Sequence, residues 1–229
     1  MDNTLQLHFF RFEGFKNRFW AFMQMQLAHG ALQRVSGVRF YKLMGTGGGD
    51  GFQWYPDFST YALLMQFDTP EAATAFKASS ILKSYLNRTE EHAVFYLQAY
   101  EAHGYWSKQQ PFVMHPFQPD KPIAVITRAR IKWKYLRAFW RDVPAASKSL
   151  EPFDARLMGK GIGEWPIIQQ ATFSIWQNQE AMMDFAYRNP EHRKVVQKTR
   201  KLGWYAEEMF ARFHPVGMEG SWRGVRWEF

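Results

Sequence analysis

The sequence contains an internal repeat. A glycine-rich motif, Leu-Met-Gly-x-Gly-x-Gly followed by an acidic residue, occurs at residues 43–50 and again at residues 157–164. A second motif, Gly-x-Trp, occurs at residues 104–106 and 220–222. Both pairs are in the same order and are separated by about 115 residues, which is typical of one module used twice in a chain. We therefore expect two similar halves, and we expect the functional site to lie where the halves differ.

Each half predicts the element order β-α-β-β-α-β, which is the ferredoxin-like plan. Hydrophobic alternation predicts strands at residues 5–12, 38–43, 60–67, 93–100, 123–130, 155–158 and 171–176, and a final strand region that follows residue 204. Helical spacing and capping residues predict helices at residues 15–32, 70–86, 132–142 and 179–201. The fold class is therefore α+β, with two tandem ferredoxin-like modules that form an intramolecular dimeric α+β barrel.

The domain boundaries follow from the repeat and from a stretch with three prolines. We expect an N-terminal module over residues 1–106, a proline-rich linker over residues 107–121 and a C-terminal module over residues 122–229. The inner faces of the two sheets are expected to enclose a cavity lined by aromatic residues. Aromatic residues make up 18% of the chain, which favours either a thickly packed core or a pocket for a large apolar ligand.

The composition limits the classes of reaction that the protein can catalyse and the cellular compartments in which it can function. The chain has no cysteine, which excludes disulfides and a cysteine nucleophile and fits a reducing cytoplasm. It has no apolar run of about 18 residues and no signal-peptide pattern, so we expect a cytoplasmic protein. The formal charge is +8. Since basic and aromatic residues alternate and no nucleic-acid-binding motif is present, a membrane surface is a better candidate for a large partner than a nucleic acid, and a merely basic surface remains the alternative.

The glycine motifs do not match a nucleotide-binding pattern. Their spacing is not that of a dinucleotide-binding loop, and neither is followed by Lys-Ser or Lys-Thr. We interpret each as a glycine-rich turn between two strands that lets the backbone approach a partner closely. Asp50 and Glu164, which follow the glycines, are candidate acids or bases, although such residues more often satisfy turn backbone. Glu207 and Glu208 are interpreted as the solvated face of a helix.

His192 is the most informative of the seven histidines. Asn189 and Pro190 predict the start of a helical segment, so His192 falls within its first turn. It shares an apolar or small-residue face with Val195, Val196 and Thr199, while Arg193, Lys194 and Lys198 lie beside it. A neutral imidazole flanked by cations suits a haem pocket, where it can bind the iron while the cations pair with the propionates. The alternative is a histidine packed at a surface where a helix begins.

Several stretches of the sequence resemble the spheroidene monooxygenase family of carotenoid biosynthesis. They cover the chain from near residue 5 to near residue 222, and the stretch from Gly159 to Phe213 is the most specific. The similarity rests on Phe9-Phe10-Arg11-Phe12, Lys42-Leu43-Met44-Gly45-Thr46-Gly47, Gly104-Tyr105-Trp106-Ser107, Gly159-Lys160-Gly161-Ile162-Gly163-Glu164-Trp165-Pro166, Gln170-Ala171-Thr172-Phe173-Ser174, Ala186-Tyr187 and Trp204-Tyr205.

The resemblance implies a haem-dependent monooxygenase. Such an enzyme would use O₂ and electrons from a small donor such as ferredoxin to hydroxylate, and then convert to a ketone, the C-2 region of an acyclic carotenoid-type polyene. The fold implied is that of haem proteins related to chlorite dismutase and aldoxime dehydratase, in which a histidine of the C-terminal module binds the iron.

On this resemblance His192 is the expected axial ligand of haem b. Lys160, Arg193 and Lys198 are the expected contacts at the cofactor edge, and Gln170, Thr172 and Trp165 are candidates for the catalytic side of the pocket.

Two alternatives remain open at this stage. The same fold could carry a haem lyase or dehydratase, which would need no reductant. The chain could also be a non-catalytic module that binds haem or another apolar ligand. A haem spectrum separates the last alternative from the enzymes, and dependence of turnover on a reductant separates the two enzymes. We also expect contact of a basic, aromatic exterior with the membrane in which a polyene dissolves.

Overall fold

The computed structural model describes residues 4–49, 53, 55–141, 155–188, 197–198 and 201–229. In the first half the elements are β1 (Leu5–Phe12), α1 (Gly14–Leu27), α2 (His29–Leu32), β2 (Val38–Gly47), β3 (Pro56–Phe67), α3 (Pro70–Lys77), α4 (Ser80–Leu86) and β4 (Thr89–Gly104). In the second half they are β5 (Ile123–Ile131), η1 (Trp133–Tyr135), β6 (Arg156–Trp165), β7 (Gln169–Trp176), α6 (Gln179–Met183), η2 (Asp184–Arg188) and β8 (Tyr205–Gly220).

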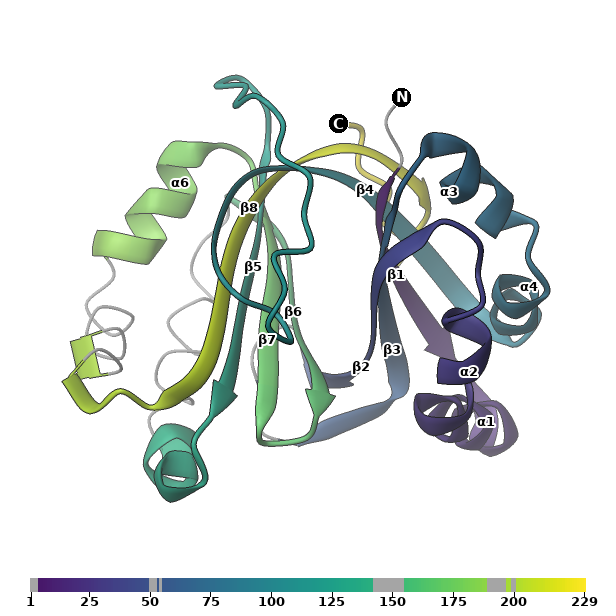
Figure 1. Cartoon of the computed structure of the whole chain (residues 1–229), viewed down its shortest axis with the longest axis horizontal. Coiled ribbons are helices and arrows are strands. Elements are labelled where there is room, and N and C mark those ends of the chain that lie inside the picture. The colour runs from purple at the N-terminus through teal and green to yellow at the C-terminus, as the bar shows by residue number, and fades with distance from the viewer. Residues whose placement is uncertain (1–3, 50–52, 54, 142–154, 189–196, 199–200) are drawn as a thin grey trace.

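The eight strands form one closed antiparallel barrel in the order β1-β3-β2-β6-β7-β5-β8-β4. Helices α1 to α4 cover the outside of the first half, and α6 with the helical segment after β5 lies outside the second half (Figure 1). The α+β class and the barrel of two ferredoxin-like halves are therefore confirmed. The boundaries at residues 106 and 122 stay a prediction.

The interior of the barrel is packed with side chains. Phe9 and Phe173 lie on opposite strands of the barrel, yet their ring centroids are 5.8 Å apart, and Phe95 lies 5.7 Å from Phe173. All three rings are fully buried. An eight-stranded barrel is just wide enough for its own side chains to fill. The expectation of an aromatic-lined cavity between the inner faces was therefore wrong, because the aromatic residues themselves occupy the axis.

The prediction that the glycine motifs form turns was wrong for the second copy and holds for the end of the first copy, where Gly49 lies in the turn after β2 with a φ of 66°. Gly45 and Gly47 belong to β2, and Gly159, Gly161 and Gly163 belong to β6. The turn of the second half follows at residues 166–168, where Ile167 has a φ of 72°. The close backbone approach that glycine permits is nevertheless present, since Gly45 pairs with Gly163 where the two halves join. The two copies of the motif therefore meet at a seam of the barrel.

Three further elements differ from the sequence-based prediction. The helix predicted at residues 15–32 is two helices, and its apolar residues Phe15 and Phe19 face solvent, while Ala21, Ala28 and Leu32 are buried. The helix predicted at residues 70–86 is also two, because Ser79 caps the start of α4. Glu207 and Glu208 lie in β8 and not on a helix.

The Gly-x-Trp motifs close the second seam, between β4 and β8. Gly104 and Gly220 have φ angles of 84° and 79°. A Cβ at Gly104 would overlap the carbonyl oxygen of Glu208, and one at Gly220 would overlap that of His92. The tryptophans that follow, Trp106 and Trp222, are buried. Glycine is thus required for two reasons, namely the left-handed backbone and the neighbouring strand.

We expect Gly104→Ala and Gly220→Ala to lower the free energy of unfolding by more than Gly14→Ala does. Gly14 also has a positive φ, of 71°, but nothing lies within 4 Å of its added Cβ, so it isolates the backbone cost of about 1–2 kcal/mol. Urea unfolding followed by circular dichroism measures all three variants. Equal losses in the three variants would contradict the steric argument.

Candidate functional site

The outer faces of the two half-barrels carry different side chains, although their strands pair in the same way. In the first half, Phe10 pairs with Tyr61 and His8 pairs with Leu63, and all four are buried beneath the helices. His8 Nδ1 also lies 3.0 Å from Nε2 of His92. Large side chains therefore fill the space between this sheet and α1 to α4, and leave no room for a flat ligand there.

The corresponding face of the second half carries small side chains. Ile126, Phe173 and Ile162 point into the barrel core, so strand alternation places their neighbours on the outside. Thr127 pairs with Thr172, which pairs with Gly161. On the rows beside them, Ala129 and Gly163 flank Gln170, and Val125 and Gly159 flank Ser174. We call these nine residues the small-residue platform.

The dimensions of the platform follow from the strand geometry. Three strands span roughly 10 Å across, and residues four positions apart span roughly 13 Å along a strand. This is comparable to the footprint of a porphyrin ring. Three of the nine residues lack a side chain, so the surface presents mostly backbone, methyl groups and the hydroxyls of Thr127, Thr172 and Ser174.

Aromatic clusters bound the platform at both ends of β5. Near Ile123, the rings of Trp176 and Phe185 stack with centroids 5.2 Å apart. Near Ile131, Phe139 contacts Trp204 at 5.8 Å. Between the two clusters Thr127 is exposed. Along this outer face, small residues therefore lie between two groups of large aromatic residues. Such an arrangement forms a flat surface that is bounded at both ends.

Arg212 is one of the basic groups at the margin of the platform. Arg212, on the outer face of β8, pairs with Val125 and is nearly buried. Its Nη1 donates to Glu101 at 2.6 Å, and its Nε has no hydrogen-bond partner among the described residues. An incompletely paired guanidinium beside an open face can hold an anionic ligand group. The sequence analysis missed this residue, since only the register of β5 and β8 brings it beside the platform.

The structure brings some of the predicted site residues together and separates others. Gln170 and Thr172 share the platform, and Gln170 Nε2 donates to the carbonyl oxygen of Trp165 at 3.1 Å, where Trp165 is exposed at the hairpin tip. Lys198 lies beside the platform, with its Nζ 5.7 Å from the ring centroid of Trp204. His192 and Arg193 lie outside the described residues, so their roles stay predictions.

Lys160 lies on the opposite face of β6 from Gly159 and Gly161. Its buried Nζ donates to the carbonyl oxygen of Gly49 at 3.0 Å and lies 3.3 Å from Oδ2 of Asp57. These contacts are inside the barrel, so the platform and Lys160 do not share a site. The predicted contact of Lys160 with the cofactor remains a prediction, and the position of its side chain does not favour it.

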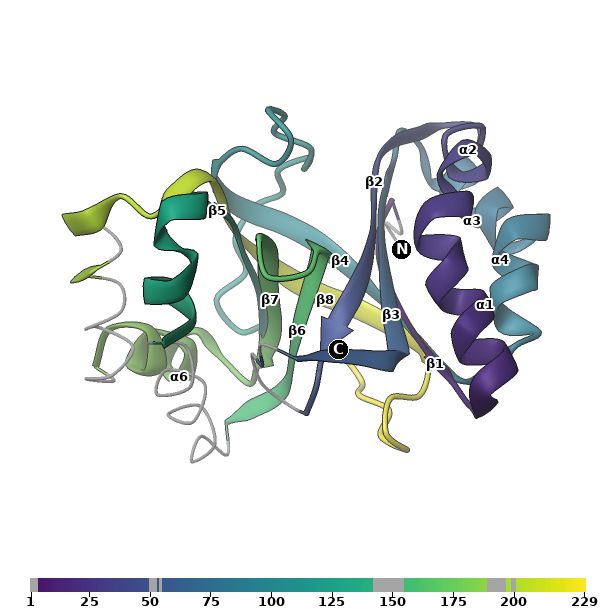
Figure 2. The same cartoon turned by 90° about the horizontal axis from the view of Figure 1, so that it is seen from below.

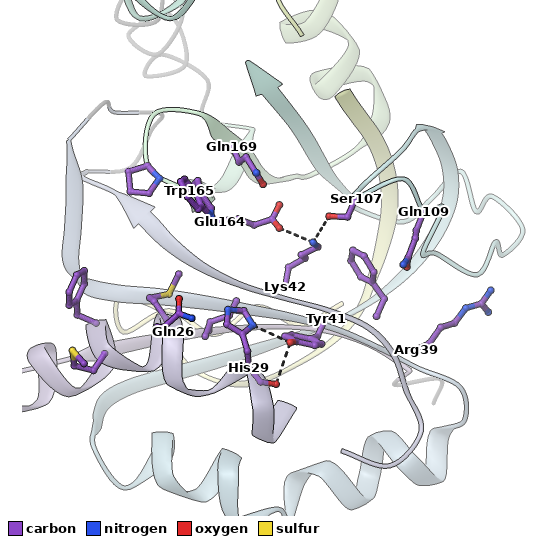
Figure 3. A pocket seen from close by; sticks show the side chains of 16 residues that line it. Gln26, His29, Arg39, Tyr41, Lys42, Ser107, Gln109, Glu164, Trp165 and Gln169 are labelled. Atoms are coloured by element: carbon purple, nitrogen blue, oxygen red, sulfur yellow. Dashed lines mark hydrogen bonds and ion pairs between the residues drawn. The ribbon is translucent and has the colours of Figure 1, made fainter. Parts of the chain in front are cut away.

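A groove of about 730 Å³ runs between α1 and the β6–β7 hairpin (Figure 3). Phe22, Met25 and Trp165 contribute apolar walls, and Arg39 and Gln109 line its polar end. A smaller cavity of about 170 Å³ shares Phe22, Met25, Glu164 and Pro166 with the groove and is also lined by Gly163 and Gln170. The two spaces therefore connect the surface near α1 with one edge of the small-residue platform.

A network of charges forms one wall of the groove. Lys42 Nζ donates to Glu164 at 2.7 Å and to Ser107 Oγ at 2.6 Å, as Figure 3 shows. Trp106 Nε1 donates to the same carboxylate at 2.7 Å. Arg128 bonds to Glu164 and to Glu207, and its side chain is only 3% exposed. Glu164 is therefore fixed by partners from both halves, and its role as a free acid or base is not supported by this environment.

Glu207 also stabilises the turn after β4. Its carboxylate accepts hydrogen bonds from the backbone N–H groups of Ser107 and Lys108, both of which have positive φ angles. Burial raises the pKa of this carboxyl, but these two bonds and Arg128 outweigh that effect and hold the pKa below its ordinary value. Glu207 thus stays ionised in the folded protein and is a structural anion.

Two classes of feature were not found in the described part of the chain. No group of three or more His, Asp or Glu side chains could hold a metal ion by itself. No described helix is long and apolar enough to cross a bilayer.

Comparisons with known proteins place the chain in a family. The chain is 39% identical to spheroidene monooxygenase of Rhodobacter capsulatus over 224 residues, which is 95% of this chain and 92% of that protein. It is 32% identical to spheroidene monooxygenase of Cereibacter sphaeroides, over 96% of this chain and 69% of that protein. It is 34% identical to that of Rubrivivax gelatinosus, over 83% and 74% of the two chains. No family model matches the sequence.

Solved structures agree on the fold. Aldoxime dehydratase in complex with butyraldoxime superposes with a TM-score of 0.59 at 10% identity, covering 92% of this chain and 79% of that one. A second aldoxime dehydratase structure gives a TM-score of 0.58 at 8% identity. These likenesses bear on architecture alone, whereas the sequence identities extend along nearly the whole chain. The protein belongs to the spheroidene monooxygenase family.

Proposed function

We propose that this protein is a haem-dependent monooxygenase that hydroxylates, and then converts to a ketone, the C-2 region of an acyclic carotenoid-type polyene. The relatives named above act, by their names, on spheroidene. The observation that carries the cofactor part of the proposal is the difference between the two outer faces. One face is filled with buried Phe, Tyr and Leu side chains, and the other offers a surface of Gly, Ala, Ser, Thr and Val with one Gln beside a groove.

The residues of the platform fit a haem group. Gly161, Thr127 and Thr172 form the central row on which a ring would lie, and the aromatic clusters at both ends give apolar edges. The guanidinium of Arg156 lies over Gly159, so it is a further cation at the edge of this surface. Arg212 at the margin provides a cation for a propionate. When bound, the haem would supply the activation of O₂ that no side chain can provide, and electrons would come from a small donor such as ferredoxin.

The axial ligand is proposed to be His192. The chain has seven histidines, and the positions of six of them are described. His8 and His92 contact each other in the first half, His29 bonds to Tyr41, and His214 bonds to the carbonyl oxygen of Pro122. His103 is exposed and lies 3.0 Å from Glu101, and His115 precedes β5. None of the six is on the platform, which supports the sequence-based choice of His192.

The groove is proposed to hold the body of the polyene. Its apolar part, with Phe22 and Met25, continues to Gly163 and Gln170 at the edge of the platform. A bound polyene chain would therefore lie along the seam between the halves, with one end at the platform. The amide of Gln170 lines this end of the cavity, and Thr172 lies on the next row of the platform, so these two side chains would orient the end of the polyene.

An absorption spectrum tests the cofactor and its ligand together. We expect the protein purified with haem supplied to show a strong Soret band near ~400–415 nm, and His192→Ala to lose or shift this band because the axial imidazole sets the ligand field. His103→Ala is the matched control, since that histidine is exposed. A band unchanged in His192→Ala would remove His192 as ligand, and no band in the wild type after haem addition would end the haem proposal.

The reaction itself is tested by turnover of an acyclic carotenoid with ferredoxin, a reductase and ¹⁸O₂. Incorporation of the label into a hydroxy and then a keto product supports a monooxygenase. Turnover without reductant would instead indicate a lyase or dehydratase on the same fold.

A further inference from the structure

The outward face of α1 carries large apolar side chains that no other described part of the chain covers. Phe15 is 85% exposed and Phe19 is 55% exposed, and Phe22, Met23 and Leu27 continue the stripe along the helix. These positions recur at helical spacing, which normally marks the face that packs on a core. Here Ala21 and Ala28 make that contact instead. A contiguous exposed apolar face of this kind marks an interaction site.

The exposed apolar surface extends beyond α1 to the tip of the β6–β7 hairpin and to the segment after β5. Phe22 lies 5.9 Å from Phe58 and lines the same cavity as Ile167. Trp140 Nε1 donates to the carbonyl oxygen of Ile167 at 3.0 Å, which ties the hairpin tip to the segment that begins with Trp133, itself 75% exposed. In Figure 2, the view from below, α1 and this segment lie on either side of the hairpin.

Basic residues predominate in the two segments that carry this surface, which are flanked by Glu13 and Asp142 in the sequence. Residues 14–49, which include α1, contain no Asp or Glu and five basic residues, Lys16, Arg18, Arg34, Arg39 and Lys42. Residues 130–141 likewise contain no Asp or Glu and five basic residues, Arg130, Lys132, Lys134, Arg137 and Arg141. Exposed aromatic and aliphatic side chains between Lys and Arg residues are the composition of a surface that enters an anionic lipid interface.

We propose that this face, formed by the outer stripe of α1, the β6–β7 hairpin tip and Trp133, docks on an anionic lipid bilayer. The groove described above has its apolar mouth, at Phe22 and Trp165, on the same face. Docking therefore places the mouth against the hydrocarbon region, and an apolar ligand enters the groove from the bilayer without crossing water. The role of the groove rests on the proposed function, whereas docking itself depends only on the surface.

Vesicle flotation with the full chain tests the proposal without cofactor or turnover. We expect the protein to float with phosphatidylcholine vesicles that contain phosphatidylglycerol, and to float much less with phosphatidylcholine alone or at raised salt. Phe15→Ser combined with Phe19→Ser removes two anchors that the fold does not use, and should weaken binding on the order of 100-fold. Lys16→Gln and Lys134→Gln should each weaken it roughly fivefold.

Phe117→Ser is the matched control for the aromatic change. Phe117 is 43% exposed and precedes β5, whose other end leads to Trp133, so it lies at the opposite end of the barrel. The proposal requires this variant to bind as the wild type does. It is overturned if the wild type does not float with anionic vesicles, or if the Phe15→Ser/Phe19→Ser variant binds undiminished. It is also overturned if sedimentation shows a dimer that this variant abolishes, because a second copy would then cover the face. Failure of docking with an intact Soret band and turnover would leave the proposed function standing.

Discussion

Replacing Thr127 with Phe and Thr172 with Tyr is expected to weaken haem binding strongly while the barrel stays folded. The two replacements introduce the ring types that fill the outer face of the first half, where Phe10 pairs with Tyr61 and both are buried. Thr127 is exposed and Thr172 is half-buried, so the larger rings occupy the space above the small-residue platform. Each overpacked ring costs about 1–3 kcal/mol, so haem affinity should fall roughly 100-fold or more. Haem titration followed at the Soret band measures this change.

The control for this double variant is Thr74→Phe. Thr74 is an exposed residue of α3 in the first half, so the same kind of change there should leave haem affinity at the wild-type value. Thermal unfolding of the apoprotein provides a second readout, and the double variant should remain cooperative with a midpoint close to that of the wild type. Wild-type haem affinity in the folded double variant would move the cofactor site away from the platform.

Arg128→Ala is expected to produce the largest loss of stability among single substitutions in the charge network. The guanidinium lies between Glu207 and Glu164, contacts Gln169, and sits 5.8 Å from the ring centroid of Trp106. Removing it leaves two partly buried carboxylates without their shared cation. Breaking a buried ion pair by removal of one partner costs about 3–5 kcal/mol. Urea unfolding of the apoprotein at neutral pH measures the loss.

The pH dependence of this loss identifies its cause. The pKa of Glu207 is held below its ordinary value of 4.5, so the folded protein binds its proton less readily than the unfolded chain does. The stability that Glu207 contributes is therefore present above pH 4.5 and is lost as the pH falls through the lower folded value. Arg128→Ala should reduce this dependence, and Arg128→Lys should restore part of it. A deficit in Arg128→Ala that is equally large at every pH would indicate lost packing rather than lost charge.

Much of the fold could be predicted from the sequence because its determinants are local or repeated. The alternation of Leu5 to Phe12 identifies a strand wherever it lies, and the cap formed by Thr69 before Pro70 identifies a helix start. The recurrence of the glycine motifs identified two copies of one module, and two half-barrels whose strands need partners can satisfy each other by closing into one barrel. The glycines of β2 and β6 were misassigned as turns, because a Gly-x-Gly pattern occurs both in turns and in strands whose backbones approach each other closely.

The candidate site depended on neighbours that are distant in the chain. Thr127, Thr172 and Gly161 form one row only because β5, β7 and β6 pair in a particular register, and Arg212 joins their edge through β8. The sequence alone singled out Gln170 and Thr172, yet it could not place Lys160 inside the barrel. Alternation along a strand shows which residues share a face, but it does not show which of the two faces points inward.

The tertiary structure also decided which face of α1 packs on the barrel and which face is exposed. An apolar stripe at Phe15, Phe19 and Phe22 is compatible with packing on a core or with an external lipid surface, and periodicity is identical in the two cases. The sequence by itself therefore determined the two modules, their order and the residues that are candidates for binding or catalysis. Only the tertiary structure decided which faces are filled and which are open, because burial is a property of pairs of surfaces and local sequence describes only one of them.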